Sequence, residues 1–186
     1  MASHDRILDR RRSVLLVIDL QESYRGKLRE EERTLRGARR LLAAAAELAI
    51  PVLVTEQYPK GLGATREEIA SALPADAMRF EKTSFSAAGA PGLLEQIREL
   101  GRDQVVLAGI ETHVCVGQSA HDLLQAGLQV HAVRDAISAR FALEDEMGFA
   151  KLLGSGVIPA SVEAALFEWL RDSRAPEFKA IHRLVV

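Results

Sequence analysis

Apolar positions fall along the chain in two patterns, short continuous runs and longer stretches with helical spacing. The short runs predict six strands, at residues 13–18, 51–55, 78–81, 104–108, 128–133 and 156–158. Between them, apolar residues three and four apart predict helices over 34–49, 65–73, 91–100, 116–126, 143–153 and 162–170. This alternation is typical of βαβ units, so we predict an α/β, three-layer Rossmann-like fold with a mostly parallel six-stranded sheet.

Length and charge limit what this fold can do. The 186 residues, 48% of them hydrophobic, suit one well-filled core, and no linker interrupts them, so we predict a single domain over 1–186. The net charge is −2, with basic and acidic residues interleaved. Such a surface disfavours nucleic acid and membranes as partners and favours a small-molecule substrate.

The compartment follows from the single cysteine and the first residues. One cysteine cannot form an internal disulfide, which favours a reducing environment. Residues 1–12 are polar and lack the apolar core of a secretion signal, and the apolar run at 14–18 is too short to span a bilayer. We therefore predict a soluble, cytoplasmic protein.

The only cysteine lies where a central strand passes into a helix. Gly109 ends the apolar run 104–108, and Cys115 precedes the helical pattern of 116–126. A thiol in the first turn of a helix lies near unpaired N–H groups and the positive end of the dipole, which favours a thiolate nucleophile. The competing interpretation is a small buried hydrophobic residue, which is commoner for a lone cysteine.

Two charged residues also close predicted strands. Asp19 follows the apolar run 14–18, where a buried carboxylate would be costly unless a cation holds it. Lys82 follows the strand 78–81, and alone it would be interpreted as a surface lysine. Because ligands of parallel α/β sheets bind outside the carboxyl ends of the strands, we predict that Asp19, Lys82 and Cys115 share one site.

At these three positions the chain resembles the isochorismatase-like cysteine hydrolases, and the resemblance covers nearly the whole chain. The motif blocks that carry it are Val-Ile-Asp-Leu-Gln at 17–21, Phe-Glu-Lys-Thr-Ser-Phe-Ser at 80–86 and Gly-Ile-Glu-Thr-His-Val-Cys at 109–115. The stretches 55–63, 109–116 and 176–179 look most like the isochorismatase domain-containing subgroup, for which no settled substrate can be carried over. The resemblance implies an isochorismatase-like fold, a homo-oligomer, and an Asp-Lys-Cys triad made by Asp19, Lys82 and Cys115.

Further expectations about the site follow from the same resemblance. It implies an oxyanion hole formed by the backbone N–H groups of Glu111 and Cys115, with a cis peptide between Ile110 and Glu111. Nicotinamidases of this family hold a metal with an Asp-x-His pair after the second strand, whereas this chain has Glu56, Gln57 and Tyr58 there. We therefore expect no metal and no cofactor.

These residue types support hydrolysis through a covalent intermediate. Asp19 would take the proton of Cys115, Lys82 would orient Asp19, and the sulfur would attack a carbonyl or imidate carbon and form a thioester. We expect a small amide or related C–N bond as substrate. An isochorismatase-type vinyl ether hydrolase remains an alternative, because such enzymes can dispense with the cysteine.

Pocket walls and other functions stay open at this point. We assign Tyr24, Tyr58, Phe85 and Thr112, together with Phe141, to the substrate-binding wall, although each aromatic residue is equally typical of ordinary core or surface. A non-catalytic, oligomerising or partner-binding module on the same fold would not need the triad. A thiol-based redox sensor is a third alternative, but the chain has no resolving cysteine.

Overall fold

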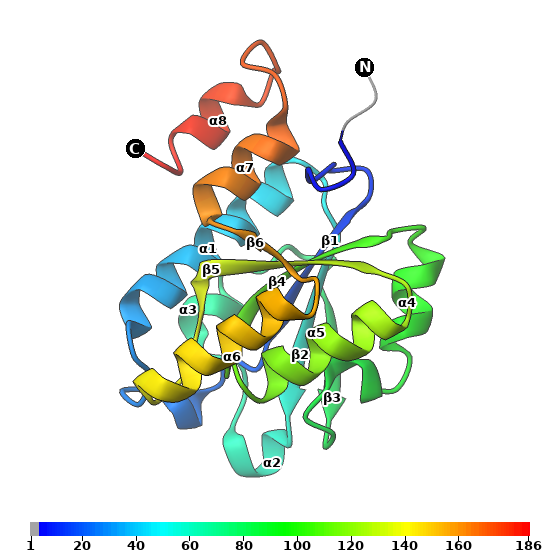
Figure 1. The fold of residues 1–186 in the computed structure, drawn as a ribbon. Helices are drawn as coiled ribbons and strands as arrows, with labels where there is room; N and C mark the ends of the chain where they lie inside the picture. The colour runs from blue at the N-terminus through cyan, green and yellow to red at the C-terminus, as the bar shows by residue number, and fades with distance from the viewer. Residues whose placement is uncertain (1–3) are drawn as a thin grey trace.

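The computed structural model describes residues 4–186 and contains one six-stranded sheet (Figure 1). Its strands are β1 (Ser13–Ile18), β2 (Val52–Gln57), β3 (Met78–Lys82), β4 (Gln104–Ile110), β5 (Gln129–Ser138) and β6 (Ile158–Ala160). The strand order is β3-β2-β1-β4-β5-β6, and every neighbouring pair is parallel. The predicted α/β class is confirmed, and the sheet is wholly parallel.

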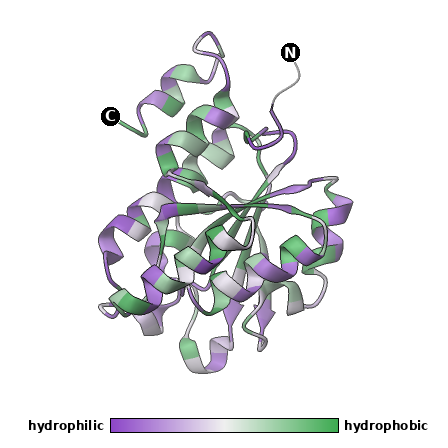
Figure 2. Cartoon of the chain, viewed as in Figure 1, coloured by the Kyte–Doolittle hydropathy of each residue, from purple (hydrophilic) through white to green (hydrophobic). Residues whose placement is uncertain are grey.

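Helices cover both faces of this sheet. They are α1 (Glu31–Glu47), α2 (Pro59–Leu62), α3 (Glu67–Ala70), α4 (Leu93–Glu99), α5 (Cys115–Gln125), α6 (Ala142–Gly154), α7 (Val162–Leu170) and α8 (Phe178–His182), with 3-10 turns at Glu22–Tyr24 and Ala87–Gly89. Alternate residues of β1 serve the two cores: Leu15 and Val17 pack with α1 and α7, and Leu16 and Ile18 with α4 and α5. Figure 2 accordingly shows hydrophobic strands at the centre and polar outer helix surfaces.

The largest error in the predicted elements concerns β5. We predicted that it ends at Val133, because charged residues follow, but it continues to Ser138. Arg134 forms an ion pair with Asp145 at 2.7 Å, and the Asp135 carboxylate accepts the N–H of Val162 at 2.8 Å. These tertiary partners satisfy the two charged side chains, so the strand does not have to end at them.

Helix ends also differ from the predicted boundaries. Helix α1 begins at Glu31, three residues early, and α3 is shorter than the predicted 65–73. The pattern did not predict the short helices α2 and α8. The C-terminal residues pack on their own domain: Ile181 is fully buried, and Leu184 and Val185 are partly buried against the same core. Within residues 4–186, no helix is long and apolar enough to cross a membrane.

Close contact between β1 and β4 positions the functional edge. Gly109 pairs with Ile18 and has φ of +125°, and a β-carbon added to it would lie 2.1 Å from the Ile18 carbonyl oxygen. Only glycine fits this close approach. The contact places Asp19, the residue after Ile18, beside the turn that leads to Cys115.

Candidate active site

The carboxyl ends of three strands bring the predicted reactive residues together. Asp19 directly follows β1 with φ of +52°, Lys82 is the last residue of β3, and Cys115 is the first residue of α5. The Lys82 ammonium donates to Asp19 Oδ2 at 2.7 Å, and both side chains are buried. The carboxylate that closes the first apolar run is therefore held by a cation, which meets the cost of its burial.

Further polar groups fix this ion pair in place. Besides Asp19, Lys82 Nζ contacts Gln57 Oε1 at 2.7 Å and the carbonyl oxygens of Ser84 and Phe85 at 3.3 and 3.0 Å. Thr55 Oγ1 donates to the other carboxylate oxygen, Asp19 Oδ1, at 2.7 Å. The sequence analysis missed Thr55 and Gln57. Both lie at the end of β2, the strand between β1 and β3, where neutral polar residues are ordinary and give no distinct sequence signal.

The reactive thiol is buried and neutral at rest. Cys115 is only 7% exposed, and burial together with the nearby Asp19 carboxylate raises the pKa of its thiol to about 12. Lys82 acts in the opposite direction and lowers this pKa, but with a smaller effect. The structure thus differs from the predicted thiolate: burial and the Asp19 carboxylate outweigh Lys82, and the thiol keeps its proton.

The turn before Cys115 has the backbone geometry that the resemblance implied. The peptide bond between Ile110 and Glu111 is cis. Within residues 4–186, the N–H groups of Glu111 and Cys115 donate to no protein acceptor, whereas the Glu111 carbonyl oxygen accepts from Val114 and Val116. Two unpaired backbone donors thus lie in the same turn as the thiol.

Thr112 links this turn to the neighbouring helix. Its side chain is fully buried, and Oγ1 donates to Asp145 Oδ1 at 2.5 Å. Asp145 also accepts two hydrogen bonds from Arg134, and these interactions lower the pKa of Asp145 against the effect of its burial. The Thr112 hydroxyl is therefore occupied in anchoring the turn on α6.

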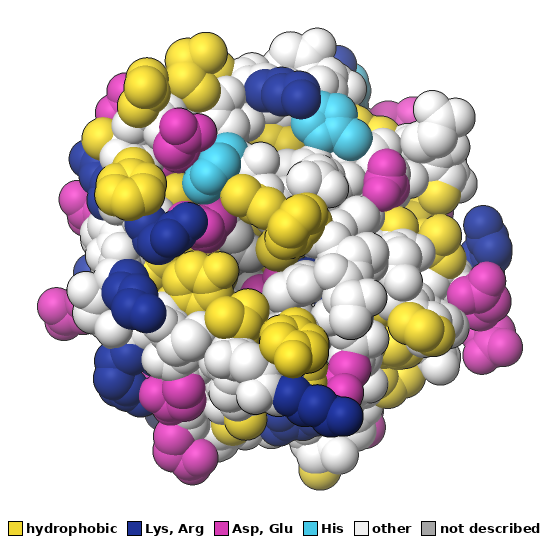
Figure 3. Space-filling model, turned by 90° about the horizontal axis from the view of Figure 1, so that it is seen from below, with side chains coloured by type: hydrophobic (Ala, Val, Ile, Leu, Met, Phe, Trp, Pro, Cys, Tyr) yellow, Lys and Arg dark blue, Asp and Glu magenta, His cyan; other side chains and the backbone are white. Residues whose placement is uncertain are grey.

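The aromatic residues predicted as pocket walls all lie at this edge, but at different depths. Tyr24 is half-buried, and burial raises its pKa, as does the nearby carboxylate of Glu111. Tyr58 and Phe85 are each 54% exposed, and Phe141 is 61% exposed. Figure 3 views this edge from below and shows hydrophobic side chains spread over it. Among these four aromatic residues, Tyr24 is thus the most buried.

A second ion pair, which the sequence analysis missed, lies beside the thiol. The backbone N–H and the side-chain Nε of Arg140 both donate to Glu111 Oε1 at 3.0 Å. The Glu111 side chain is buried, whereas that of Arg140 is 44% exposed. The only sequence signal was an arginine shortly after a strand end, which is also typical of an ordinary surface residue.

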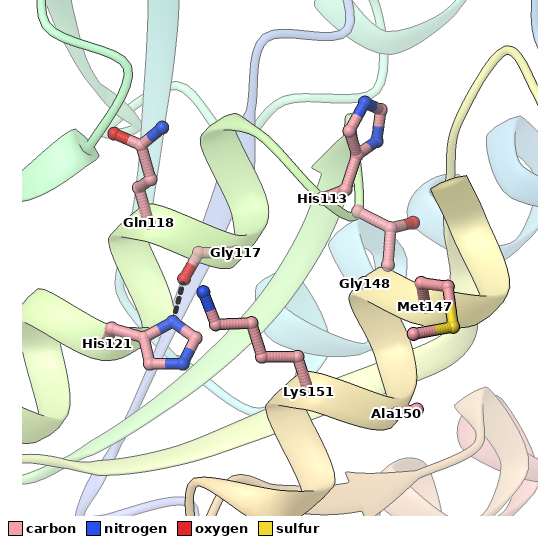
Figure 4. Close-up of a pocket in the computed structure, with 9 residues that line it drawn as sticks. His113, Gly117, Gln118, His121, Met147, Gly148, Ala150 and Lys151 are labelled. Carbon is pink, nitrogen blue, oxygen red and sulfur yellow. Dashed lines mark hydrogen bonds between the residues drawn. The ribbon is translucent and has the colours of Figure 1, made fainter. Parts of the chain in front are cut away.

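Two cavities flank the reactive residues. One of about 410 Å³ lies between α5 and α6, where Lys151 extends toward Gly117 and His121 (Figure 4). The other, of about 420 Å³, lies beside Tyr58 and the end of β3. Lys82 lines the second cavity, but Cys115 and Asp19 line neither, so the chemistry of these residues locates the site better than cavity size does.

Metal-ligating clusters do not occur in the part of the chain that the structure describes: no three His, Cys, Asp or Glu side chains there are arranged to hold an ion. Glu56, the second-last residue of β2, is already engaged. Its Oε1 accepts from the backbone N–H of Thr65 at 2.7 Å and from the Thr65 hydroxyl at 2.5 Å. This carboxylate therefore serves the loop.

Comparisons with known proteins agree with the fold. Residues 13–164 match the family model described as Isochorismatase domain. Isochorismatase domain-containing protein 2 of Danio rerio is 38% identical over 175 residues, which cover 93% of this chain and 86% of the relative. A structure described as MAR1 ribonuclease of Caenorhabditis elegans superposes with TM-score 0.92 and 36% identity, over 96% of this chain and 92% of that one. The YcaC gene product of Escherichia coli, described as an octameric hydrolase of unknown specificity, shares the fold with TM-score 0.89 and 20% identity, over 99% and 91%.

Proposed function

The chain belongs to the isochorismatase domain family, and on that premise we propose that it is a metal-independent cysteine hydrolase of small amides or related C–N bonds. The observation that carries the proposal is the buried pair of Asp19 and Lys82 beside the single cysteine. A buried ion pair contributes little to stability compared with apolar packing. Its position next to a nucleophile at the carboxyl edge favours a catalytic role.

In the first step, Asp19 takes the thiol proton as the sulfur attacks the carbonyl carbon. Because the thiol pKa is about 12, proton loss and attack are expected to occur together. Lys82 has Asp19, Gln57 and two carbonyl oxygens as acceptors, so it orients the carboxylate and does not donate a proton. The oxyanion that forms would accept hydrogen bonds from the free N–H groups of Glu111 and Cys115.

In the second step, protonated Asp19 gives its proton to the leaving nitrogen. The C–N bond breaks, the amine departs, and the acyl group remains on Cys115 as a thioester. Asp19, now a carboxylate again, takes a proton from water, whose oxygen attacks the thioester carbon. The thiol regains that proton as the acid leaves, so one amide and one water yield one acid and one amine.

Three alternatives make different predictions. A non-catalytic module would tolerate replacement of Asp19, Lys82 and Cys115, and an isochorismatase-type vinyl ether hydrolase would release a carbonyl product without a thioester. The similar Caenorhabditis elegans protein is described as a ribonuclease. RNA cleavage is less favoured here, because the chain has a net charge of −2 and interleaved charges.

We also propose that the protein forms a homo-oligomer. The exposed face at the carboxyl edge carries Phe141, Leu143 and Met147, each at least 60% exposed. Exposed apolar side chains of this size are typical of protein interfaces. Sedimentation of the purified chain tests this point, and a monomer at micromolar concentration would contradict it.

The decisive experiment combines activity with capture of the intermediate. A panel of small primary amides is scored by ammonia release, and the intact mass of the protein is measured after rapid acid quench. We expect turnover and an acyl adduct in the native protein, and neither in Cys115→Ala. Ammonia release that persists in Cys115→Ala would overturn the covalent mechanism, and RNA cleavage without amide turnover would favour the ribonuclease alternative.

A further inference from the structure

Arg140 presents an unused fork of hydrogen-bond donors near the thiol. Its Nε and its backbone N–H bond Glu111, but within residues 4–186 its Nη1 and Nη2 atoms have no acceptor. The guanidinium lies over the ring of Phe141, 5.5 Å from its centroid, and the bond to Glu111 raises the pKa of Arg140. The guanidinium is therefore charged and held at Nε by Glu111. Its Nη1 and Nη2 atoms, which can form paired hydrogen bonds with a carboxylate, are free.

Several contacts place this fork at the reactive centre. Glu111, its anchor, starts the turn that ends at Cys115 and contributes one of the free N–H groups. Tyr24 lies close enough to Glu111, Cys115, Arg140 and Asp19 for these groups, when they are charged, to act on the pKa of its hydroxyl. The Tyr24 hydroxyl has no protein partner in the described part of the chain. Arg140 and Tyr24 thus offer polar donors beside the thiol, where a substrate would lie.

The other charges near the thiol are paired. Lys82 is fully engaged with Asp19 and its further acceptors, so it has no donor left for a substrate. Thr112 is bonded to Asp145. Of Lys82 and Arg140, Arg140 is therefore the one with free donors. Its two free N–H groups lie in one plane and can bond both oxygens of a carboxylate, whereas a neutral amide has one acceptor oxygen.

We propose that Arg140, assisted by Tyr24, is the specificity-determining residue of the site and binds a carboxylate on the acyl part of the substrate. The substrate class is then a monoamide of a small dicarboxylic acid, with one end cleaved and the other held by the guanidinium fork. This inference rests on the proposed hydrolase function, but its test does not require turnover.

The first measurement compares two alkylating agents that differ in charge. Iodoacetate and iodoacetamide both react by forming a bond from the Cys115 sulfur to carbon as iodide leaves and the thiol proton passes to solvent. The longer pair 3-bromopropionate and 3-bromopropionamide varies the spacing. With one cysteine in the chain, intact mass reports the reaction at Cys115 alone. The same chain unfolded in urea gives the intrinsic ratio of anionic to neutral rates.

We expect the native protein to react with one anionic agent at least about tenfold faster, relative to its amide, than the unfolded chain does. Arg140→Gln should lose this preference, which is scored as the ratio of the anionic to the neutral rate so that a change common to both agents cancels. Arg36→Gln, which removes an equal charge on exposed α1, should retain the preference. A native ratio at or below that of the unfolded chain for both pairs would overturn the proposal.

A binding measurement tests the proposal even if Cys115 reacts with none of the alkylating agents. In Cys115→Ser, calorimetry should show succinamate binding at least about tenfold tighter than neutral succinamide, and Arg140→Gln in that background should abolish the difference. Arg140→Lys keeps a charge beside Glu111 but lacks the paired N–H groups, and it should give an intermediate preference. That result would show that the loss in Arg140→Gln does not come from misfolding. Equal binding of the two ligands would overturn the carboxylate assignment. A thiol inert to every agent, with succinamate still preferred, would instead count against the nucleophile of the proposed function.

Discussion

The two edges of the sheet each bury a polar cluster, but the clusters differ in charge. At the amino edge, Gln104 accepts from Ser13 and donates to Gln129, which also contacts His131. Trp169 donates to Ser13. These groups are neutral, because burial and the charge of Arg12 lower the pKa of His131 to about 4. At the carboxyl edge, the cluster contains a full ion pair of Asp19 and Lys82 and a thiol.

This difference in charge indicates which cluster contributes to stability and which to the reaction. A neutral hydrogen-bonded cluster costs little to bury and fixes the packing of β1, β4 and β5. A buried ion pair is expensive to desolvate and contributes little net stability compared with apolar packing. The charged cluster is therefore expected to serve the reaction, and the neutral one the fold. The predictions below test this separation, from the largest expected effect to the smallest.

Asp19→Asn should have the largest effect, and in two opposite directions. Loss of the general base should lower amide turnover by about 10²–10⁴-fold. Because the Asp19 charge raises the pKa of Cys115, its removal should shift iodoacetamide alkylation to lower pH. Turnover and alkylation are measured on the same preparation, with Asp172→Asn on the surface as control. A more reactive thiol in an inactive enzyme is the expected result, and retained turnover would contradict the assigned role of Asp19.

Lys82→Met tests whether the charged pair costs stability. The single variant leaves the Asp19 carboxylate buried without its cation and should lower the free energy of unfolding by about 3–5 kcal/mol. Asp19→Asn combined with Lys82→Met removes both charges and should recover most of that loss, still without turnover. Urea unfolding measures both variants. If the double variant is less stable than either single one, the pair is stabilising and the comparison between edges fails.

Much of this site could be predicted from the sequence, because its signals are local. Asp19, Lys82 and Cys115 each close an apolar strand pattern or start a helix, and parallel strands bring their carboxyl ends to one edge. Thr55 and Gln57 could not be singled out, since neutral polar residues at a strand end are ordinary. Their role depends on β2 lying between β1 and β3, which is known only from the sheet order.

Two errors show where local signals fail. The helix terminus predicted a thiolate at Cys115, whereas burial and Asp19 raise the thiol pKa to about 12. The charges of Arg134 and Asp135 predicted the end of β5, whereas Asp145 and Val162 satisfy them inside the fold. In both cases a tertiary contact outweighed the preference of the local sequence.

His131 gives the neutral cluster a pH signature of its own. Its pKa is lowered to about 4 in the folded protein from 6.5, so the unfolded chain binds more protons between these values. Stability should therefore fall as pH drops from about 6.5 to 4, by up to about 3 kcal/mol. Urea unfolding across this range, compared with His131→Gln, checks the slope. An equal slope in both proteins would assign the pH dependence to other groups.

The smallest effects are expected from glutamine to leucine substitutions, which can be made at both edges of the sheet and so compare the two clusters directly. Gln57→Leu and Gln104→Leu each remove a buried amide of similar volume and should each lower the free energy of unfolding by about 1–3 kcal/mol. Gln57 is an acceptor of the Lys82 ammonium, which lowers the pKa of Cys115. Gln57→Leu should therefore shift alkylation to higher pH and reduce turnover by about tenfold, whereas Gln104→Leu should change neither. Equal alkylation profiles in the two variants would mean that Lys82 keeps its position through Ser84 and Phe85 alone, and that Gln57, like Gln104, serves only the fold.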